Sequence, residues 1–519
     1  MVSATGFVSF HGTQNERIRY KRPFEYHDTM LTAATIGILL TFIFLASSLG
    51  LKQDKLSAKT APTIHSFVPW LGSFFEFCWD AQGFLRKWRF KLGPIYRVHI
   101  VGREFVVVSH AEGIAHVMRD PQKSLTNDFN TTILEAAGDI IPQHFDQVLF
   151  GKLASLALRT FSNRNVPRLA PVFNRQLLRN FNSFSSSGGR ERVSLTNFIG
   201  QSLYNSVCMS LWGPHFPIDS FADFQLIDSN ISRLLSPMLF PPRKAVQARK
   251  SLKAELGKYL QRASFGDKDE VEEDVYGATE IVEIIRSSNL PSSDQQGVFL
   301  GFMFALHSNS IRMSTWFMTY LLCDTSVWAR LRDEVDLAIG TEFESLEALL
   351  SAPPHRIGGD TLPLLDSALK EALRLSVAAV LMRRVTQNCE LPVNDIDSVK
   401  VTEGEYIFAN GCAINMEDDV FEDACSFRVD RFLKNESHKS APVSAFGGGA
   451  HMCKGRDFAM YEMKMFAILC LKLLDISIEN PDGSSAEGQS PKADYVYPTP
   501  VFFPKELFVR IQKRRDSTA

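Results

Sequence analysis

The chain has 519 residues, of which 45% are hydrophobic and 22% are charged, so it contains enough apolar material for a large folded core. Its formal net charge of −2 gives no reason to expect nucleic acid as a partner. Eight cysteines occur without paired spacing, which argues against a disulfide framework and for reduced thiols in a cytosol-facing protein.

A polar tail, residues 1–29, precedes an apolar segment. Residues 30–51 are 22 residues without a charge, and a helix of that length spans about 33 Å, enough to cross a bilayer core of about 30 Å. A cleaved signal peptide is the alternative, since Ala46-Ser47-Ser48 is a passable cleavage site, but the tail is too long for a normal n-region. We therefore predict a single transmembrane anchor, whose flanking basic residues on both sides leave its orientation open.

Residues 52–69 form a polar, proline-bearing linker to a predicted catalytic domain, residues 70–519. Within that domain, residues 93–102 and 105–109 are rich in β-branched side chains and predict two short strands about a turn. Helical periodicity dominates the next two hundred or so residues, and no internal repeat is present.

Residues 301–322 predict a long apolar helix that carries a polar patch at His307, Ser308, Asn309 and Ser310. Burying polar side chains costs free energy unless they are hydrogen-bonded, so the patch needs partners, water or a function. A purely structural patch that kinks or hydrates the helix is the alternative. A lone helical histidine is more typical of a satisfied interior residue than of a metal ligand.

Residues 362–375 predict a further helix in which Glu371 and Arg374 share one face. This i, i+3 spacing allows the two side chains to pair. The usual meaning of such a pair is an exposed contact that stabilises the helix by only a few tenths of a kcal/mol.

Residues 446–459 place one cysteine, Cys453, among glycines and directly before a helical pattern. Glycine permits tight turns and close approach, so this loop can present a thiolate to a flat cofactor. No CxxC partner exists for zinc or an iron–sulfur cluster, and no Gly-Lys-Ser/Thr follows as in a phosphate loop. A lone axial cysteine points to haem; a glycine-rich loop around a buried structural cysteine is the alternative.

Together these segments resemble cytochrome P450 enzymes. The loop is similar to the family pattern Phe-x-x-Gly-x-(Arg/His)-x-Cys-x-Gly, which is filled here by Phe446, Gly449, His451, Cys453 and Gly455. The resemblance covers roughly residues 60–510. It implies a mainly α P450 fold with a minor β region, and haem b held through Cys453 as the axial ligand of its iron.

The resemblance also assigns supporting residues. It implies that Glu371 and Arg374 are buried, joined by Arg431, and hold the loop that carries the cysteine. Arg383, on a strand, should meet a haem propionate, with Arg384 the less favoured choice.

At a position where arginine is more usual, His451 can donate a hydrogen bond but is charged only when protonated. This substitution makes His451 a predicted partner of the cofactor rather than a fixed positive charge.

The helix 301–322 is similar to that of the branch with sterol 7α-hydroxylases and prostacyclin synthase. Most family members place an acid and an alcohol where this chain has Asn309 and Ser310, the predicted catalytic residues. Ser310 is expected to anchor a water, and Asn309 to orient that water or the substrate. Arg312 replaces a proline of that branch.

The resemblance implies a haem-thiolate monooxygenase acting on an apolar substrate such as a steroid or terpenoid, of the fungal secondary-metabolism type. The chain has no flavin or nicotinamide fingerprint, so a separate NADPH-cytochrome P450 reductase must supply electrons. We expect a monomer in the endoplasmic reticulum membrane with its catalytic domain in the cytosol. The rivals are a haem-thiolate isomerase or dehydratase that needs no O₂ or reductase, and a non-enzymatic membrane haem protein.

Overall fold

The computed structural model of the chain describes residues 60–66, 68–144, 147–186, 192–235, 242–262, 278–378, 380–394, 397–433, 445–479, 493–494 and 501–514. The predicted tail and anchor, residues 1–51, lie outside these ranges. Within them, no helix combines the length and the apolar character needed to cross a membrane.

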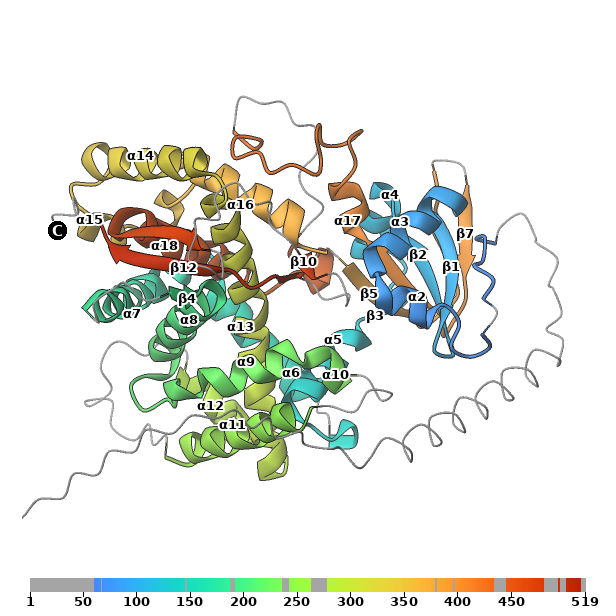
Figure 1. Cartoon of the computed structure of the whole chain (residues 1–519). Helices are drawn as coiled ribbons and strands as arrows, with labels where there is room; N and C mark the ends of the chain where they lie inside the picture. The colour runs from blue at the N-terminus through green and yellow to red at the C-terminus, as the bar shows by residue number, and fades with distance from the viewer. Residues whose placement is uncertain are drawn as a thin grey trace, which may run out of the picture.

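A five-stranded sheet forms one side of the molecule (Figure 1). Its strand order is β1-β2-β8-β5-β3. The predicted pair of strands is confirmed as an antiparallel hairpin whose turn, Val101-Gly102, has φ of 49° and 71°. The strands are β1 (Ile95–Ile100), β2 (Arg103–Val108), β3 (Leu125–Thr126), β5 (Val380–Val385) and β8 (Tyr406–Asn410).

The end of the predicted linker belongs to this sheet region. Ile64 N–H donates to the Arg97 carbonyl at 2.9 Å, and Arg97 N–H donates to the Pro62 carbonyl at 2.8 Å. Ala61 and Ile64 are buried. The folded domain therefore begins several residues before residue 70.

Helices form the larger part of the fold (Figure 1). They are α2 (Phe74–Trp79), α3 (Ala81–Leu92), α4 (Ala111–Arg119), α5 (Asp128–Gly138), α6 (Gln147–Phe161), α7 (Val166–Ser186), α8 (Leu195–Trp212), α9 (Phe221–Ser229), α10 (Ile231–Leu235), α11 (Arg243–Arg262), α12 (Ala278–Arg286), α13 (Ser292–Leu322), α14 (Thr325–Thr341), α15 (Leu346–Leu350), α16 (Pro363–Ser376), α17 (Gly411–Asn415) and α18 (Arg456–Leu473), with short 3₁₀ turns η1 (Pro142–His144), η2 (Ile218–Ser220), η3 (Pro354–Arg356) and η4 (Gly449–His451).

Helix α13 runs through the centre of this helical part (Figure 1) and contacts α5, α8, α11, α16 and α18. Most of its faces are apolar, as expected for a helix that is surrounded by others. Thr315 and Thr319 are buried, and their hydroxyls donate to the carbonyls of Ile311 and Thr315 one turn earlier. The helix can therefore carry hydroxyl groups at little cost, and it begins nine residues before the predicted start at Gly301.

Three smaller sheets complete the described structure. Strand β12 (Phe508–Lys513) lies between β4 (Arg192–Ser194) and β9 (Leu474–Glu479), and β6 (Cys389–Pro392) pairs with β7 (Ser398–Val401). Strands β10 (Ala493–Asp494) and β11 (Phe503–Pro504) pair antiparallel near the C-terminus. All eight cysteines are free thiols, as their spacing predicted. The fold class, mainly α with a minor β region, is confirmed.

Candidate haem site

The loop that carries Cys453 is closed by its own backbone. Cys453 N–H donates to the Phe446 carbonyl at 2.8 Å, so the two ends of the glycine-rich stretch are tied together. Helix α18 begins at Arg456, three residues after the cysteine. The first N–H groups of a helix carry partial positive charge, so this position favours a negatively charged sulfur.

Two glycines of the loop lie against Met118 at the end of α4. A Cβ on Gly449, whose φ is 58°, would lie 2.2 Å from the Met118 carbonyl oxygen. A Cβ on Gly448 would lie 2.6 Å from the Met118 sulfur. Glycine is therefore required at position 449 both by conformation and by space, which explains this part of the pattern.

The Cys453 thiol is accessible, although enough protein surrounds it for burial to raise its pKa. The Gly455 N–H and the positive charges of Lys454 and Arg456 act in the opposite direction and lower the pKa. The loop thus presents a reachable thiol with positive groups around it.

Arg383 and His451 lie close together at the edge of this loop. Arg383 is buried on β5, whereas Arg384 is exposed, so the strand directs the predicted residue inward. Burial lowers the pKa of His451, and the nearby charges of Arg383 and Lys454 lower it further. A neutral imidazole and a buried guanidinium both remain hydrogen-bond donors for an anionic group.

The predicted contact between Glu371, Arg374 and Arg431 is present, and all three side chains are fully buried. Arg374 donates from Nε and Nη2 to the two Glu371 oxygens at 2.8 Å each. Arg431 Nε donates to Glu371 Oε1 at 2.9 Å. The pair is therefore a core ion pair and not an exposed helix contact.

The two guanidinium groups also bind main-chain oxygens. Arg374 donates to the carbonyls of Asn415, Ala424 and Ser426, and Arg431 to those of Glu422, Asp423 and Ser426. These contacts fasten α16 to the segment 415–431, which leads towards the Cys453 loop. The three residues thus act on the loop through the chain that precedes it.

On α13, the two predicted catalytic residues differ in exposure. Asn309 is exposed, together with Ala305 one turn earlier, whereas Ser310 is buried. The Ser310 hydroxyl donates to the Leu306 carbonyl at 3.1 Å. Its lone pairs remain available to accept a hydrogen bond, so it can still hold a water or an acid.

The structure adds Glu462, a residue that the sequence analysis missed. Glu462 lies on α18, is buried, and forms a hydrogen bond with Ser310; burial raises its pKa to about 8. The carboxyl is therefore mostly protonated at neutral pH. The available signal was an acid among the apolar residues in the middle of the helix that follows Cys453.

His307 is an interior residue, as predicted. Its ring is buried against Tyr204, and Nε2 lies 3.4 Å from the Cys208 sulfur. Burial lowers its pKa to about 3, so the imidazole is neutral. His307 thus packs against side chains of α8 and is not part of the Cys453 site.

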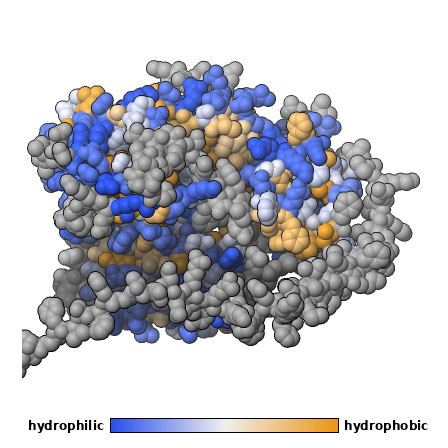
Figure 2. Space-filling view, viewed as in Figure 1, coloured by the Kyte–Doolittle hydropathy of each residue, from blue (hydrophilic) through white to orange (hydrophobic). Residues whose placement is uncertain are grey.

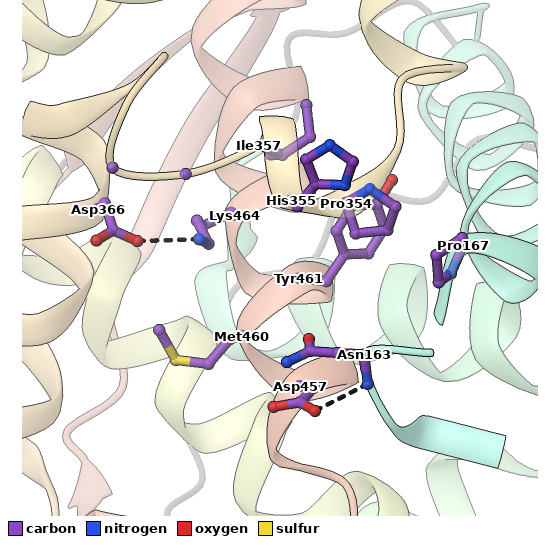
Figure 3. A pocket seen from close by; sticks show the side chains of 12 residues that line it. Asn163, Pro167, Pro354, His355, Ile357, Asp366, Asp457, Met460, Tyr461 and Lys464 are labelled. Carbon is purple, nitrogen blue, oxygen red and sulfur yellow. Dashed lines mark hydrogen bonds and ion pairs between the residues drawn. The ribbon is translucent and has the colours of Figure 1, made fainter. Parts of the chain in front are cut away.

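A separate cavity of about 440 Å³ lies beside α18 (Figure 3). Lys464 reaches into it and pairs with Asp366 at 2.9 Å, and Asp457 accepts from Asn163 N–H. None of the predicted site residues lines this cavity. The cavity is distinct from the Cys453 site. The charged side chains of Lys464, Asp366 and Asp457 that line it already have partners.

The residues present fit a haem. The sulfur is a single accessible thiol, the donor set beside it suits carboxylates, and glycines 448 and 449 let the loop approach α4 closely. In the part of the chain that the structure describes, no group of three His, Cys, Asp or Glu residues could hold a bare metal ion instead. Cys453 would ligate the iron, and Arg383 and His451 would bind the propionates.

Comparisons with known proteins identify the family. The family model described as Cytochrome P450 matches residues 62–489. The human 7-alpha-hydroxycholest-4-en-3-one 12-alpha-hydroxylase is 24% identical over 80% of this chain and 86% of its own, and the Bos taurus prostacyclin synthase is 22% identical over 80% and 87%.

The solved structure of retinoic acid-bound cyanobacterial CYP120A1 has a TM-score of 0.67, with 21% identity, and covers 88% of this chain and 100% of its own. This likeness shows that the fold is shared. The family model covers most of the chain and therefore assigns the chain to that family. The chain belongs to the cytochrome P450 family: it is a P450 monooxygenase whose cofactor is haem.

Proposed function

We propose that the protein inserts one oxygen atom from O₂ into a steroid or terpenoid, with electrons from NADPH-cytochrome P450 reductase. The observation that carries the proposal is the accessible Cys453 thiol on a closed loop directly before α18. Similarity over most of the chain to the hydroxylase of a cholestenone derivative supports a polycyclic apolar substrate. The absence of a flavin or nicotinamide fingerprint supports a separate reductase.

Bound haem supplies the activation of O₂, and a thiolate ligand favours cleavage of the O–O bond. The protein's task is to hold that group and to control water and protons around it. Arg383 would offset the charge of the carboxylates at one edge and His451 would donate a hydrogen bond to them, while the Glu371 cluster keeps the loop of Cys453 in place.

Residues of α13 and α18 hold and deliver the protons. Asn309 is exposed and can orient a water or a polar group of the substrate. Ser310 lies between this face of the helix and the protonated carboxyl of Glu462. The pair Ser310–Glu462 can therefore hold a proton next to Asn309, where most relatives have an acid on the helix itself.

We further propose that residues 30–51 anchor the protein in the endoplasmic reticulum membrane, with a monomeric catalytic domain in the cytosol. An apolar surface lies over α2 (Figure 2), where the described chain begins. Trp70, Phe75 and Trp79 are 58%, 62% and 87% exposed. Exposed aromatic side chains of this kind suit the interface of a bilayer.

The test is product analysis with the reductase, NADPH and a panel of steroids and terpenoids. A product that contains one added oxygen, and that requires NADPH and O₂, supports the proposal. A second candidate, an isomerase or dehydratase, is favoured only by Asn309 in place of the acid and by the similarity to prostacyclin synthase. Product formed without NADPH would assign the protein to that second reaction.

A further inference from the structure

A second buried ionic cluster joins α9 to α13. Asp228, in the last turn of α9, accepts a hydrogen bond from the Ser308 hydroxyl at 2.6 Å and from Arg312 Nε at 3.2 Å. Arg312 Nη2 also contacts the same carboxylate and the Asp228 carbonyl. The side chains of Arg312 and Asp228 are only 5% and 14% exposed.

This cluster fixes the point at which α9 ends. Arg312 donates to both the side chain and the main-chain carbonyl of Asp228, so it adds a side-chain donor to the C-terminal end of the helix. Ser308 lies one turn before Arg312 and therefore projects from the same face of α13. Ser308 and Arg312 of α13 thus both contact Asp228 of α9.

A short helix, α10, follows directly after this contact. Helix α9 ends at Ser229, and α10 begins at Ile231 and contacts α5. Helix α5 in turn packs on α13, where a Cβ on Gly297 would lie 2.5 Å from the Gly138 carbonyl oxygen, and it contacts β5, the strand of Arg383. Figure 1 shows α5 and α10 on the side of α13 that faces the five-stranded sheet.

We propose that Arg312, with Asp228 and Ser308, is a positioning group that locks the α9–α10 junction onto α13 and so sets how closely α10 and α5 cover a bulky apolar ligand of the haem. The proposal rests on the proposed function, because only then is the exposed face of α13 at Asn309 part of a substrate site. Neither Arg312 nor Asp228 touches the reacting atoms.

The physical basis is selection of one geometry. A buried ion pair adds little net stability over an apolar contact of the same volume, but it is satisfied in very few arrangements. Without the pair, the junction would populate other positions, and a ligand that needs the closed position binds more weakly by the fraction of closed molecules. A ligand too small to reach α10 is unaffected.

The test uses two probes that share one iron-binding ring. Imidazole is small, whereas clotrimazole carries an imidazole ring on a bulky triphenylmethyl group; both shift the Soret band when they bind the haem iron. The variant is Asp228→Asn combined with Arg312→Met, which removes both charges and so leaves no buried charge unpaired. We expect the Kd of clotrimazole to rise about tenfold, a typical coupling between contacting residues, while that of imidazole stays within about twofold.

Two further variants complete the design. Ser308→Ala, which keeps the ion pair, should weaken clotrimazole binding by a smaller factor. The matched control, Arg332→Met with Asp475→Asn, removes an ion pair of 2.9 Å between α14 and β9 and should leave both Kd values unchanged. Equal changes for both probes, no change, or tighter clotrimazole binding in the Asp228→Asn, Arg312→Met variant would overturn the proposal. A wild-type protein that gives no Soret shift with imidazole would instead contradict the haem assignment.

Discussion

The molecule contains two buried arginine clusters that differ in how firmly they are held. Glu371 receives bonds from two arginines, and those arginines bind five different main-chain carbonyls, so α16 and the segment 415–431 can meet in only one way. Asp228 accepts from one arginine and one hydroxyl, and Arg312 also donates to the main-chain carbonyl of Asp228 itself. The Glu371 cluster supports the loop of the cofactor site, whereas the Asp228 cluster fixes the position of the α9–α10 junction.

Removing the acid from each cluster should give the largest difference between them. Glu371→Ala leaves two buried guanidinium groups without their carboxylate and should destabilise the fold by about 3–5 kcal/mol, with loss of bound haem. Asp228→Ala should also lower stability, but the protein that remains folded should keep its haem. Thermal unfolding and haem content per mole of protein measure both effects.

An exposed pair of the same spacing serves as the control for this comparison. Glu255 and Lys258 pair at i, i+3 on α11 with both side chains about half exposed. Glu255→Ala should therefore change stability very little. Full haem occupancy and unchanged unfolding in Glu371→Ala would show that the buried cluster does not support the site.

Substitutions of two glycines in the Cys453 loop give a second test of how the cofactor site is held. Gly449→Ala forces a side chain into a left-handed conformation and against a backbone oxygen, which should cost about 1–3 kcal/mol for the conformation alone. Gly448→Ala meets side-chain atoms of Met118 and no backbone atom, and should be milder. Haem retention should follow the order wild type, Gly448→Ala, Gly449→Ala; the reverse order of the two variants would mean that the loop is held differently.

Glu462 is a buried acid that forms a hydrogen bond with a hydroxyl, that of Ser310, whereas Glu371 and Asp228 pair with arginines. Its folded-state pKa of about 8 lies above the unfolded value of about 4.3, so the folded state binds the extra proton between these values. Stability should therefore fall as the pH rises from about 4.3 to about 8, by at most roughly 1.4 kcal/mol per pH unit. Glu462→Gln should flatten this part of the profile, as measured by denaturant unfolding at several pH values.

The pH profile also has a clear contrary outcome. If Glu462→Gln and the wild type lose stability in parallel between about pH 5 and pH 8, the carboxyl is not held protonated in the fold. In that case Glu462 could not serve as the proton source beside Ser310.

The smallest expected effect concerns Ser310. Ser310→Ala removes one hydrogen bond to a water or to Glu462, worth about 1 kcal/mol, and should shift the ratio of peroxide to product about fivefold. Haem content should not change. Coupling of NADPH consumption to product provides the measurement, and an unchanged ratio would show that the hydroxyl is no part of the relay.

Residues that lie in one local pattern could be predicted from the sequence. Cys453 and its glycines and the Glu371–Arg374 spacing each lie within a short run whose chemistry is readable, whereas Arg383 was assigned through the family resemblance. The buried state of Glu371 and the choice of Arg431 needed the family resemblance. Spacing alone describes an exposed pair equally well.

The remaining residues depend on contacts between distant segments. Asp228 lies 84 residues from Arg312, and nothing in its own helix marks it as buried. Glu462 lies on the helix after Cys453, but its pKa is raised by burial in the folded core and its hydroxyl partner, Ser310, lies on α13. Such tertiary contacts follow from packing, and no local periodicity encodes them.

The spectrum of the reduced, CO-bound protein tests the central claim most directly. With Cys453 as the iron ligand, the wild type should show the strongly red-shifted Soret band that is characteristic of CO on thiolate-ligated haem. Cys453→Ala should lose that band, while Cys425→Ala, which removes another exposed cysteine, should keep it. A red-shifted band that persists in Cys453→Ala would contradict the assignment of this loop as the haem site.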